Sequence, residues 1–357
     1  MKRILIVDDN LAILKQISAY LTDDYELSLA KSGLLAMQIC LKERPDLILL
    51  DVEMPDMDGF DVIFQLKQNP YLDRIPVIFL TASQSAEVEI KALESGARDF
   101  IIKPVEKSIL LHRIKLHLKF ASYLAQTEQI VTTLSDNIAT SFAEMIECRD
   151  ENTGGHVVRT SKYVEALGME LMKNGLFTDD LNPAELQMMV RAAPLHDIGK
   201  IAISDRILLK AGQLDDIEFS MMKRHSEIGA TILKRMYQRM PAQHYLRYAS
   251  LIAGSHHERY NGKGYPQGLA GNNIPLCGRI MAVADVYDAL MENRIYRSGM
   301  GHLQASNIIF ENSGSHFDPH IVDAFRNIRD QMIDIANMQK EKSTMFRNNL
   351  FEKENAP

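Results

Sequence analysis

Residues 1–10 read MKRILIVDDN, and the apolar run Ile4–Val7 within them ends at two adjacent aspartates. Amphipathic segments such as Asn10–Leu21 and Ala86–Glu94 alternate with further apolar runs, at Leu47–Leu50, Pro76–Leu80 and Phe100–Ile102. Continuous apolar strands separated by helices are typical of a parallel sheet that is covered on both faces. Residues 1–119 are therefore predicted to form a doubly wound α/β domain.

Polar residues follow the apolar runs of this predicted sheet. Asp8 and Asp9 follow the first run, Asp51 follows Leu47–Leu50, and Thr81 and Lys103 come directly after later runs. Because the carboxyl ends of parallel strands share one edge, these side chains should lie close together. Carboxylates gathered there repel one another unless a cation lies among them, and hard oxygen ligands favour Mg²⁺. The hydroxyl and the ammonium could hold the oxygens of a phosphoryl group.

The motifs VDD (7–9), LLD (49–51), LTA (80–82) and KP (103–104) resemble the response-regulator receiver domain over residues 1–119. The resemblance implies that Asp51 accepts a phosphoryl group from a cognate sensor histidine kinase. It also implies roles for five other positions: Mg²⁺ ligands at Asp8 and Asp9 beside Asp51, a switch pair at Thr81 and Phe100, and a phosphate contact at Lys103. The peptide before Pro104 is often cis in this family. Merely solvated strand-end acids are the alternative, but five separate positions agree with the family pattern.

A long helix with an apolar stripe is predicted after the strand signals stop. Apolar residues recur mostly at steps of three or four, at Leu116, Phe120, Leu124, Val131, Leu134, Ile138, Phe142 and Met145. Such a stripe fits a helix that packs on its own domain, and it fits equally a dimerising linker that carries a signal. Residues 120–146 are predicted to form this linker helix, with a homodimer as the sharper interpretation.

Histidines concentrate in the second half of the chain, where the pattern from 147 to 340 is helical. Eleven histidines occur in all, and most follow residue 150 in a few distinct contexts. Asp285 lies among Ile280, Val283 and Ala284, so its carboxylate is costly to bury unless it is paired or binds a metal. One histidine is usually a satisfied core residue, but five of them with two aspartates indicate a metal site. Imidazole with carboxylate suits Fe, Mn, Ni or Zn.

Four motifs of this half resemble the HD-GYP family over residues 147–340. They are HDIGK (196–200), HHERYNGKGYP (256–266), GRIMAVADVYDALMENRIYR (278–297) and SHFDP (315–319). The resemblance implies an all-α metallohydrolase domain with seven metal ligands: His156, His196, Asp197, His225, His256, His257 and Asp285. Asp197 has two oxygens and would bridge two metal ions, with Fe or Mn favoured and Ni or Zn as alternatives.

One position departs from the family pattern and lowers the expected number of metals. Family members with a third metal carry a glutamate four residues before the first histidine, and this position is Asn152. Asparagine is neutral and is a poorer ligand than glutamate. Glu151 is one residue away, so on a helix it would point about 100° away. Two metals rather than three are therefore expected.

The same resemblance gives a substrate and a reaction. The substrate would be cyclic di-GMP, with pGpG as the product and GMP after a second cut. A bridged metal pair can lower the pKa of a shared water and supply hydroxide at neutral pH, which gives Asp197 a catalytic role. Lys200, one helical turn after His196, is expected to act with it and to hold the substrate phosphates together with Arg294 and Arg297. Tyr265 would stack on a guanine or brace its glycine-rich loop, and bracing is slightly favoured.

Other functions are less consistent with the sequence. The same site could act on another cyclic dinucleotide such as cyclic GMP-AMP, or the domain could be a non-enzymatic adaptor that docks partners of the diguanylate-cyclase type. No helix-turn-helix with a basic face follows residue 120, and the net charge of −7 gives no general attraction to DNA. Three scattered cysteines and the lack of a signal peptide or membrane span predict a cytoplasmic protein. Residues 341–357 are predicted to be a polar tail.

Overall fold

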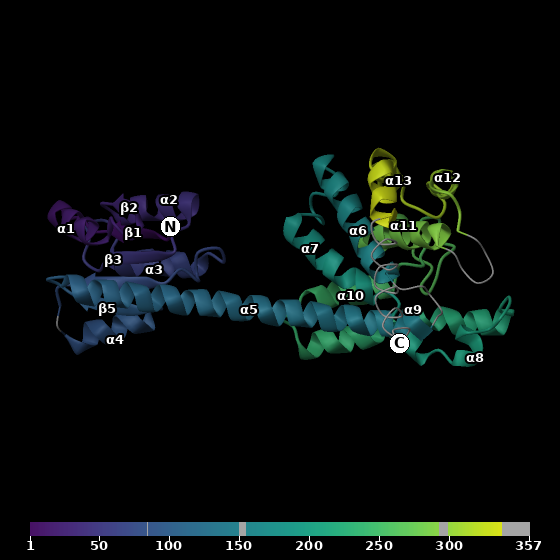
Figure 1. Ribbon diagram of the computed structural model, residues 1–357, viewed down its shortest axis with the longest axis horizontal. Helices are drawn as coiled ribbons and strands as arrows, with labels where there is room; N and C mark the ends of the chain where they lie inside the picture. The colour runs from purple at the N-terminus through teal and green to yellow at the C-terminus, as the bar shows by residue number, and fades with distance from the viewer. Residues whose placement is uncertain (84, 150–154, 293–298, 338–357) are drawn as a thin grey trace, which may run out of the picture. The chain divides into compact units, whose positions relative to one another are not determined.

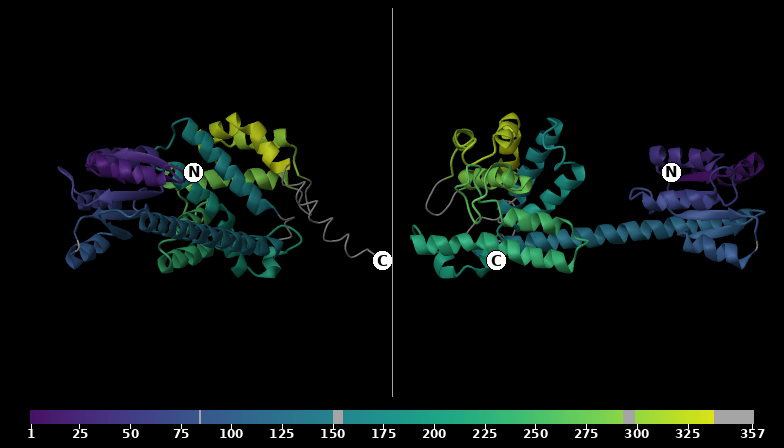
Figure 2. Two further views of the ribbon diagram at one scale, coloured as in Figure 1. Left: turned by 60° about the vertical axis from the view of Figure 1, so that its left-hand side comes forward. Right: turned by 180° about the vertical axis from the view of Figure 1, so that it is seen from behind.

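The computed structural model describes residues 1–83, 85–149, 155–292 and 299–337 of the 357. It contains two compact units, Met1–Thr132 and Thr133–Pro357. The helix α5, Lys107–Arg149, contributes to both units and is uninterrupted in every view (Figures 1 and 2). The predicted boundaries at 119 and 146 both fall inside this helix. None of the helices in the described ranges is long and apolar enough to cross a membrane.

The first unit is a five-stranded parallel sheet with helices on both faces, which confirms the predicted fold class. Its strands have the order β2-β1-β3-β4-β5. The elements are β1 (Arg3–Val7), α1 (Leu11–Leu21), β2 (Glu26–Ala30), α2 (Gly33–Glu43), β3 (Leu47–Asp51), α3 (Gly59–Gln68), β4 (Val77–Thr81), α4 (Ala86–Glu94) and β5 (Asp99–Ile102). Strand β2 was not among the apolar runs, because this edge strand reads ELSLA and only Ala30 is buried.

Alternate residues of each central strand face opposite layers of the first unit. Leu5, Val7 and Phe79 pack with α2 and α3, whereas Ile4 and Leu49 pack with α1 and the first turns of α5. Each such fully buried aliphatic or aromatic side chain contributes roughly 1.5–3 kcal/mol. The helices begin at side-chain caps, as where Asn10 accepts a hydrogen bond from the amide of Ala12. This packing places the carboxyl ends of β1, β3, β4 and β5 at one edge.

The second unit is mostly helical, as predicted. After the end of α5 it contains α6 (His156–Lys173), α7 (Pro183–Ala192), η1 (Ala193–Leu195), η2 (Ile198–Ala202), α8 (Asp205–Leu208), α9 (Asp216–Arg239), α10 (Tyr245–Ala253), η3 (Gly271–Asn273), α11 (Leu276–Met291), α12 (His302–Glu311) and α13 (Pro319–Asn327). Its core joins α6, α7, α10, α11 and α13 through side chains such as Tyr163, Leu246, Ile280 and Phe325. Most residues of α11 are buried, including Ile280, Val283 and Tyr287.

Candidate metal centre

Three carboxylates and a lysine meet at the strand-end edge of the first unit. Asp8 and Asp51 are buried, Asp9 is exposed, and the three can approach one another closely enough to share a cation. Lys103 Nζ lies 2.8 Å from Asp8 Oδ2 and 2.8 Å from Asp51 Oδ2. Burial raises the pKa of Asp51, while the hydrogen bond from Lys103 lowers it and Asp8 raises it further. Thr81 is buried at the end of β4.

The remaining receiver positions lie where the sequence pattern places them. Phe100 is half-buried on β5, directly opposite Phe79 of β4. The Lys103–Pro104 peptide is cis, as the receiver pattern led us to expect. This edge therefore brings together the predicted acceptor Asp51, its acidic neighbours and the lysine.

The second unit brings the seven predicted ligands into two adjoining groups. One group contains Asp197, His225, His256 and His257, and the other contains His156, His196 and Asp285. His156 Nε2 lies 3.4 Å from His196 Nε2, and His257 Nε2 lies 3.2 Å from His225 Nε2. These residues come from η1–η2, α6, α9, α11 and the segment after α10.

Asp197 lies between the two groups with one oxygen toward each. Its Oδ1 is 3.2 Å from His225 Nε2 and 3.6 Å from His256 Nε2. Its Oδ2 is 3.4 Å from His196 Nε2 and 2.8 Å from Lys200 Nζ. Burial would raise the pKa of Asp197, but Lys200 and His196 hold it well below the usual range. An ionised carboxylate with this placement has the geometry of a bridging ligand.

The segment that carries Asp197 and Lys200 is not the helical turn that the spacing suggested. Residues 193–195 and 198–202 form two short 3₁₀ segments, and Asp197 lies between them. A Cβ added at Gly199 would lie 1.9 Å from the carbonyl oxygen of His225, so only glycine permits this approach of η2 to α9. The close approach places His225 against Asp197, and Lys200 points to the carboxylate of Asp197 rather than along a helix from His196.

Four of the histidines are oriented by hydrogen bonds from Nδ1. His196, His225 and His256 direct Nδ1 to the carbonyl oxygens of Ala193, Met222 and Ile252 at 2.7–3.0 Å. His156 directs Nδ1 to Asp288 Oδ2 at 2.7 Å. When Nδ1 carries the proton, Nε2 keeps its lone pair and becomes the metal-binding atom.

This donor set fits divalent transition metals. His156 Nε2 and His196 Nε2 lie 3.4 Å apart, and when both rings carry their proton on Nδ1 this approach is unfavourable unless a cation lies between them. Asp197 Oδ1 and His256 Nε2 are buried and make no hydrogen bond of normal geometry with any residue that the structure describes. Unsatisfied buried polar atoms need a cause, and a mixed imidazole and carboxylate set matches Fe, Mn, Ni or Zn.

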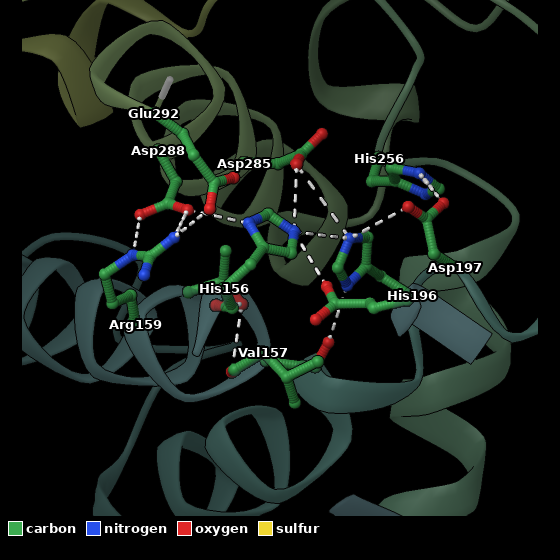
Figure 3. A network of polar contacts seen from close by, with 12 residues as sticks. His156, Val157, Arg159, His196, Asp197, His256, Asp285, Asp288 and Glu292 are labelled. Atoms are coloured by element: carbon green, nitrogen blue, oxygen red, sulfur yellow. Dashed lines mark hydrogen bonds and ion pairs between the residues drawn. The ribbon is translucent and has the colours of Figure 1, made fainter. Parts of the chain in front are cut away.

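Sequence reasoning missed the residues that support His156. Asp288 is 1% exposed and accepts hydrogen bonds from His156 and from both Nε and Nη2 of Arg159 (Figure 3). Burial would lower the pKa of His156, but Asp288 raises it to about 9. The expected buried acid of α11 was Asp285, yet the Asp285 side chain is 17% exposed and Asp288 is the buried one. The signal available was the second acid three residues after Asp285 on the same apolar helix.

Glu147 is a second residue that sequence reasoning did not identify. It lies on the last turns of α5, is 4% exposed, and places Oε1 3.5 Å from His156 Nε2. Burial raises the pKa of Glu147, although His156 and His196 lower it in part. Its sequence context, an acid beside Ile146 and Met145, carried no motif, so only the fold brings it to the site.

The loop after His257 is held by Glu258 and by tight backbone contacts. Glu258 is buried and accepts hydrogen bonds from the amides of Gln267, Gly268 and Leu269 at 2.7–3.1 Å. A Cβ at Gly264 would lie 2.3 Å from the amide nitrogen of Arg259. Tyr265 stacks on His257 with 4.7 Å between ring centroids. This contact favours a role in bracing the loop rather than in stacking on a guanine.

Four predicted features lie outside the described residues. They are Asn152 with its neighbour Glu151, the two substrate arginines Arg294 and Arg297, and the polar tail 341–357.

Comparisons with known proteins agree with this architecture. A family model described as a response regulator receiver domain matches residues 4–115, and one described as an HD domain matches residues 140–321. A Vibrio cholerae protein named probable cyclic di-GMP phosphodiesterase is 40% identical over 348 residues, covering 93% of this chain and 79% of the relative. The cyclic di-GMP phosphodiesterase response regulator RpfG of Xanthomonas campestris is 36% identical, covering 93% of this chain and 89% of the relative.

A third relative matches about half of this chain. The 3'3'-cGAMP-specific phosphodiesterase 2 of Vibrio cholerae is 37% identical over 201 residues, covering 56% of this chain and 36% of the relative. The receiver model matches the first part of the chain and the HD model matches the second, and two relatives match along 93% of it. The chain therefore belongs to the response regulators in which a receiver domain is followed by an HD-GYP output domain, the cyclic di-GMP phosphodiesterase family.

Proposed function

We propose that this chain hydrolyses cyclic di-GMP to pGpG, and further to GMP, through a binuclear metal site that the receiver domain controls. The observation that carries the proposal is the pair of ligand groups that meet at Asp197. Two relatives whose names include cyclic di-GMP phosphodiesterase match 93% of the chain. An adaptor could lose ligands without penalty, whereas all seven proposed ligands are present here.

The first metal would be held by His156, His196 and Asp285, and the second by His225, His256 and His257, with Asp197 bridging them. Fe or Mn suits this donor set, with Ni or Zn as alternatives. Such a pair, when bound, supplies a Lewis acid for the phosphate oxygens and lowers the pKa of an attacking water.

The protein's own groups would orient the reaction. Asp197 stays ionised beside Lys200 and so keeps both oxygens available for the metal pair. Lys200 would also offset charge on a non-bridging phosphate oxygen, and Arg294 and Arg297 are proposed to grip the other phosphate. Tyr265 is proposed to hold the loop beside His257, with guanine stacking as the less favoured role.

In the receiver, Asp51 is the proposed phosphoryl acceptor and Asp8, Asp9 and Asp51 are the proposed Mg²⁺ ligands. Lys103 would contact the phosphoryl oxygens, and Thr81 with Phe100 would respond to them. The donor would be a sensor histidine kinase. Three free cysteines, Cys40, Cys148 and Cys277, suit the cytoplasm, where such kinases act.

We also propose that α5 forms the contact of a homodimer. All eight members of its apolar stripe are at least 43% exposed in the single chain, including Phe120, Leu134 and Phe142. The alternative is that α5 buries this stripe against its own domain, and the exposed fractions of these side chains do not favour it. Exposed aromatic and aliphatic side chains at helical spacing suit a second copy of the same helix.

Cyclic GMP-AMP is the second candidate substrate, because one 37% identical relative is named for it. The test is anaerobic purification with metal analysis, followed by turnover of cyclic di-GMP and 3'3'-cGAMP side by side. Each assay is run with and without acetyl phosphate or beryllofluoride. Faster hydrolysis of cyclic di-GMP supports the proposal. No hydrolysis of either substrate in either receiver state, with the metals bound, would replace the enzyme with an adaptor for cyclase-type partners.

A further inference from the structure

The last turns of α5 are fixed to the second unit on one face. Ala143, Ile146 and Glu147 are buried at helical spacing, although the stripe on the other side of the helix is exposed. Arg149 donates hydrogen bonds to the carbonyl oxygens of Ile201 and Ile203, just after Lys200 in the chain. The end of α5 is therefore held beside the segment that carries Asp197.

This packing directs the carboxylate of Glu147 into the candidate metal centre. Glu147 Oε1 lies 3.5 Å from His156 Nε2, and both Glu147 oxygens are buried without a hydrogen-bond partner among the described residues. A buried carboxylate with no donor is costly, so the arrangement calls for a cation. No motif of the chain accounts for this acid.

The distances agree with a ligand shared by one metal. Two ligand atoms about 2.1 Å from the same ion are about 3.0 Å apart at a right angle and about 3.4 Å apart in a tetrahedron. His156 Nε2 lies 3.5 Å from Glu147 Oε1, 3.5 Å from Asp285 Oδ1 and 3.4 Å from His196 Nε2. Glu147 thus lies as far from His156 Nε2 as the other two proposed ligands of this metal, whereas the group whose ligand atoms all lie within 4.8 Å of one another contains His156, His196 and Asp285 without Glu147.

We propose that Glu147 is a further ligand of the metal held by His156, His196 and Asp285. The inference rests on the proposed metal pair, but it does not depend on which cyclic dinucleotide is cleaved. It supplies a carboxylate from α5 in a chain whose residue 152 is asparagine and not the glutamate of family members with a third metal. Because α5 begins at Lys107 in the first unit, a ligand on its last turns makes the helix that leaves the receiver part of the metal site itself.

The decisive variant is Glu147→Gln, which keeps the size of the side chain and removes its charge. The matched control is Glu144→Gln, the same change one turn earlier in α5. Each full-length protein is loaded anaerobically with Mn²⁺ or Fe²⁺ and titrated against a chelator. We expect one of about two metals to bind roughly ten- to a hundredfold more weakly in Glu147→Gln, with Glu144→Gln like the unmodified protein.

Hydrogen exchange gives a second readout, which begins with the unmodified protein. Metal loading of the unmodified protein should protect the amides of residues 143–149 from exchange, and Glu147→Gln should lose most of that protection. Equal chelator affinity in Glu147→Gln and the unmodified protein, or no added protection of residues 143–149 on loading, would overturn the inference alone. An unmodified protein that binds no transition metal would overturn the proposed binuclear site as well.

Discussion

The receiver pocket and the histidine centre both bury aspartates, but they balance the negative charge differently. In the receiver, Lys103 lies 2.8 Å from both Asp8 and Asp51, so an ammonium of the chain already reaches the carboxylates. In the second unit, Lys200 reaches Asp197 Oδ2, but Asp197 Oδ1 has no hydrogen-bond donor of normal geometry among the described residues. The Nε2 atoms of His156 and His196 face each other at 3.4 Å. The receiver carboxylates therefore have a cation of the chain beside them, whereas we expect the histidine centre to depend on bound metal.

Metal removal should therefore separate the two units. Chelation should destabilise the histidine centre, since metal binding and folding are coupled where ligands are buried. The receiver should keep its fold, because Lys103 still pairs with the carboxylates.

The largest effect is expected for Asp197→Ala. This change removes both bridging oxygens, so bound metal should fall sharply and hydrolysis should drop on the order of 10³-fold or more. Metal analysis and turnover measure the two losses, and a thermal melt checks the fold. Full metal content in Asp197→Ala would break the comparison, since the centre would not then depend on its bridging acid.

Lys200→Ala sharpens the same test. Lys200 pairs with Asp197 Oδ2 but carries no metal-binding lone pair while it is charged. Bound metal should stay near the unmodified level, while turnover falls roughly 10²-fold because a phosphate contact is lost. Loss of metal in Lys200→Ala would mean that the ion pair, and not the carboxylate alone, holds the centre together.

Asp51→Asn tests the receiver side. The two side chains are nearly isosteric, and Lys103 keeps Asp8 as a partner, so the fold should remain intact. Labelling by acetyl phosphate should fall to background, and hydrolysis should no longer respond to the phosphodonor. Basal hydrolysis should change little. Labelling that persists in Asp51→Asn would place the acceptor elsewhere.

The site residues that could be predicted from the sequence are those that occur in short, specific motifs. The receiver acids follow apolar strands, and the seven ligands occur in contexts such as HDIGK and HHERYNGKGYP. Glu147 could not be found this way, because its segment of α5 carries no motif. Asp288 lies inside the motif 278–297, but its role becomes visible only when α11 packs against α6 and brings it to His156.

Local backbone geometry was also beyond the sequence pattern. The four-residue interval from His196 to Lys200 suggested a helical turn, but Gly199 packs against the carbonyl of His225 and the segment forms 3₁₀ turns instead. The edge strand β2 could not be predicted from an apolar run, because only one of its five residues is buried. In both cases tertiary contacts, rather than local periodicity, determine the conformation.

Asp288→Asn should have a smaller effect on the centre than loss of the bridge. The hydrogen bond that orients His156 would weaken, so metal affinity should fall by about 10- to 100-fold. Arg159 would keep the buried carboxylate of Glu292 at 3.1 Å but lose that of Asp288, which costs roughly 1–3 kcal/mol of stability. Chelator titration measures the metal affinity, and thermal melts measure the stability.

Asp285→Asn is the control, because it should lower metal affinity with little change in the melt of the metal-free protein. Matching melts for the two variants would show that Asp288 does not stabilise Arg159.

The smallest effect is expected for Leu134→Glu, which tests whether α5, the helix between the receiver pocket and the histidine centre, forms the contact of a homodimer. Leu134 is 57% exposed in the single chain, so the change should leave the melt of a monomer nearly unaltered. In a dimer seam the new charge would be buried without a partner. Self-association should then weaken about tenfold, or ~1.4 kcal/mol, in light scattering or sedimentation.

Thr132→Glu is the matched control, because it places the same charge two residues earlier, about 200° around the helix. Response to beryllofluoride should weaken in Leu134→Glu and persist in Thr132→Glu. If both variants keep the mass and the regulation of the unmodified protein, the exposed stripe is not a dimer seam, and control must pass within one chain through α5 itself.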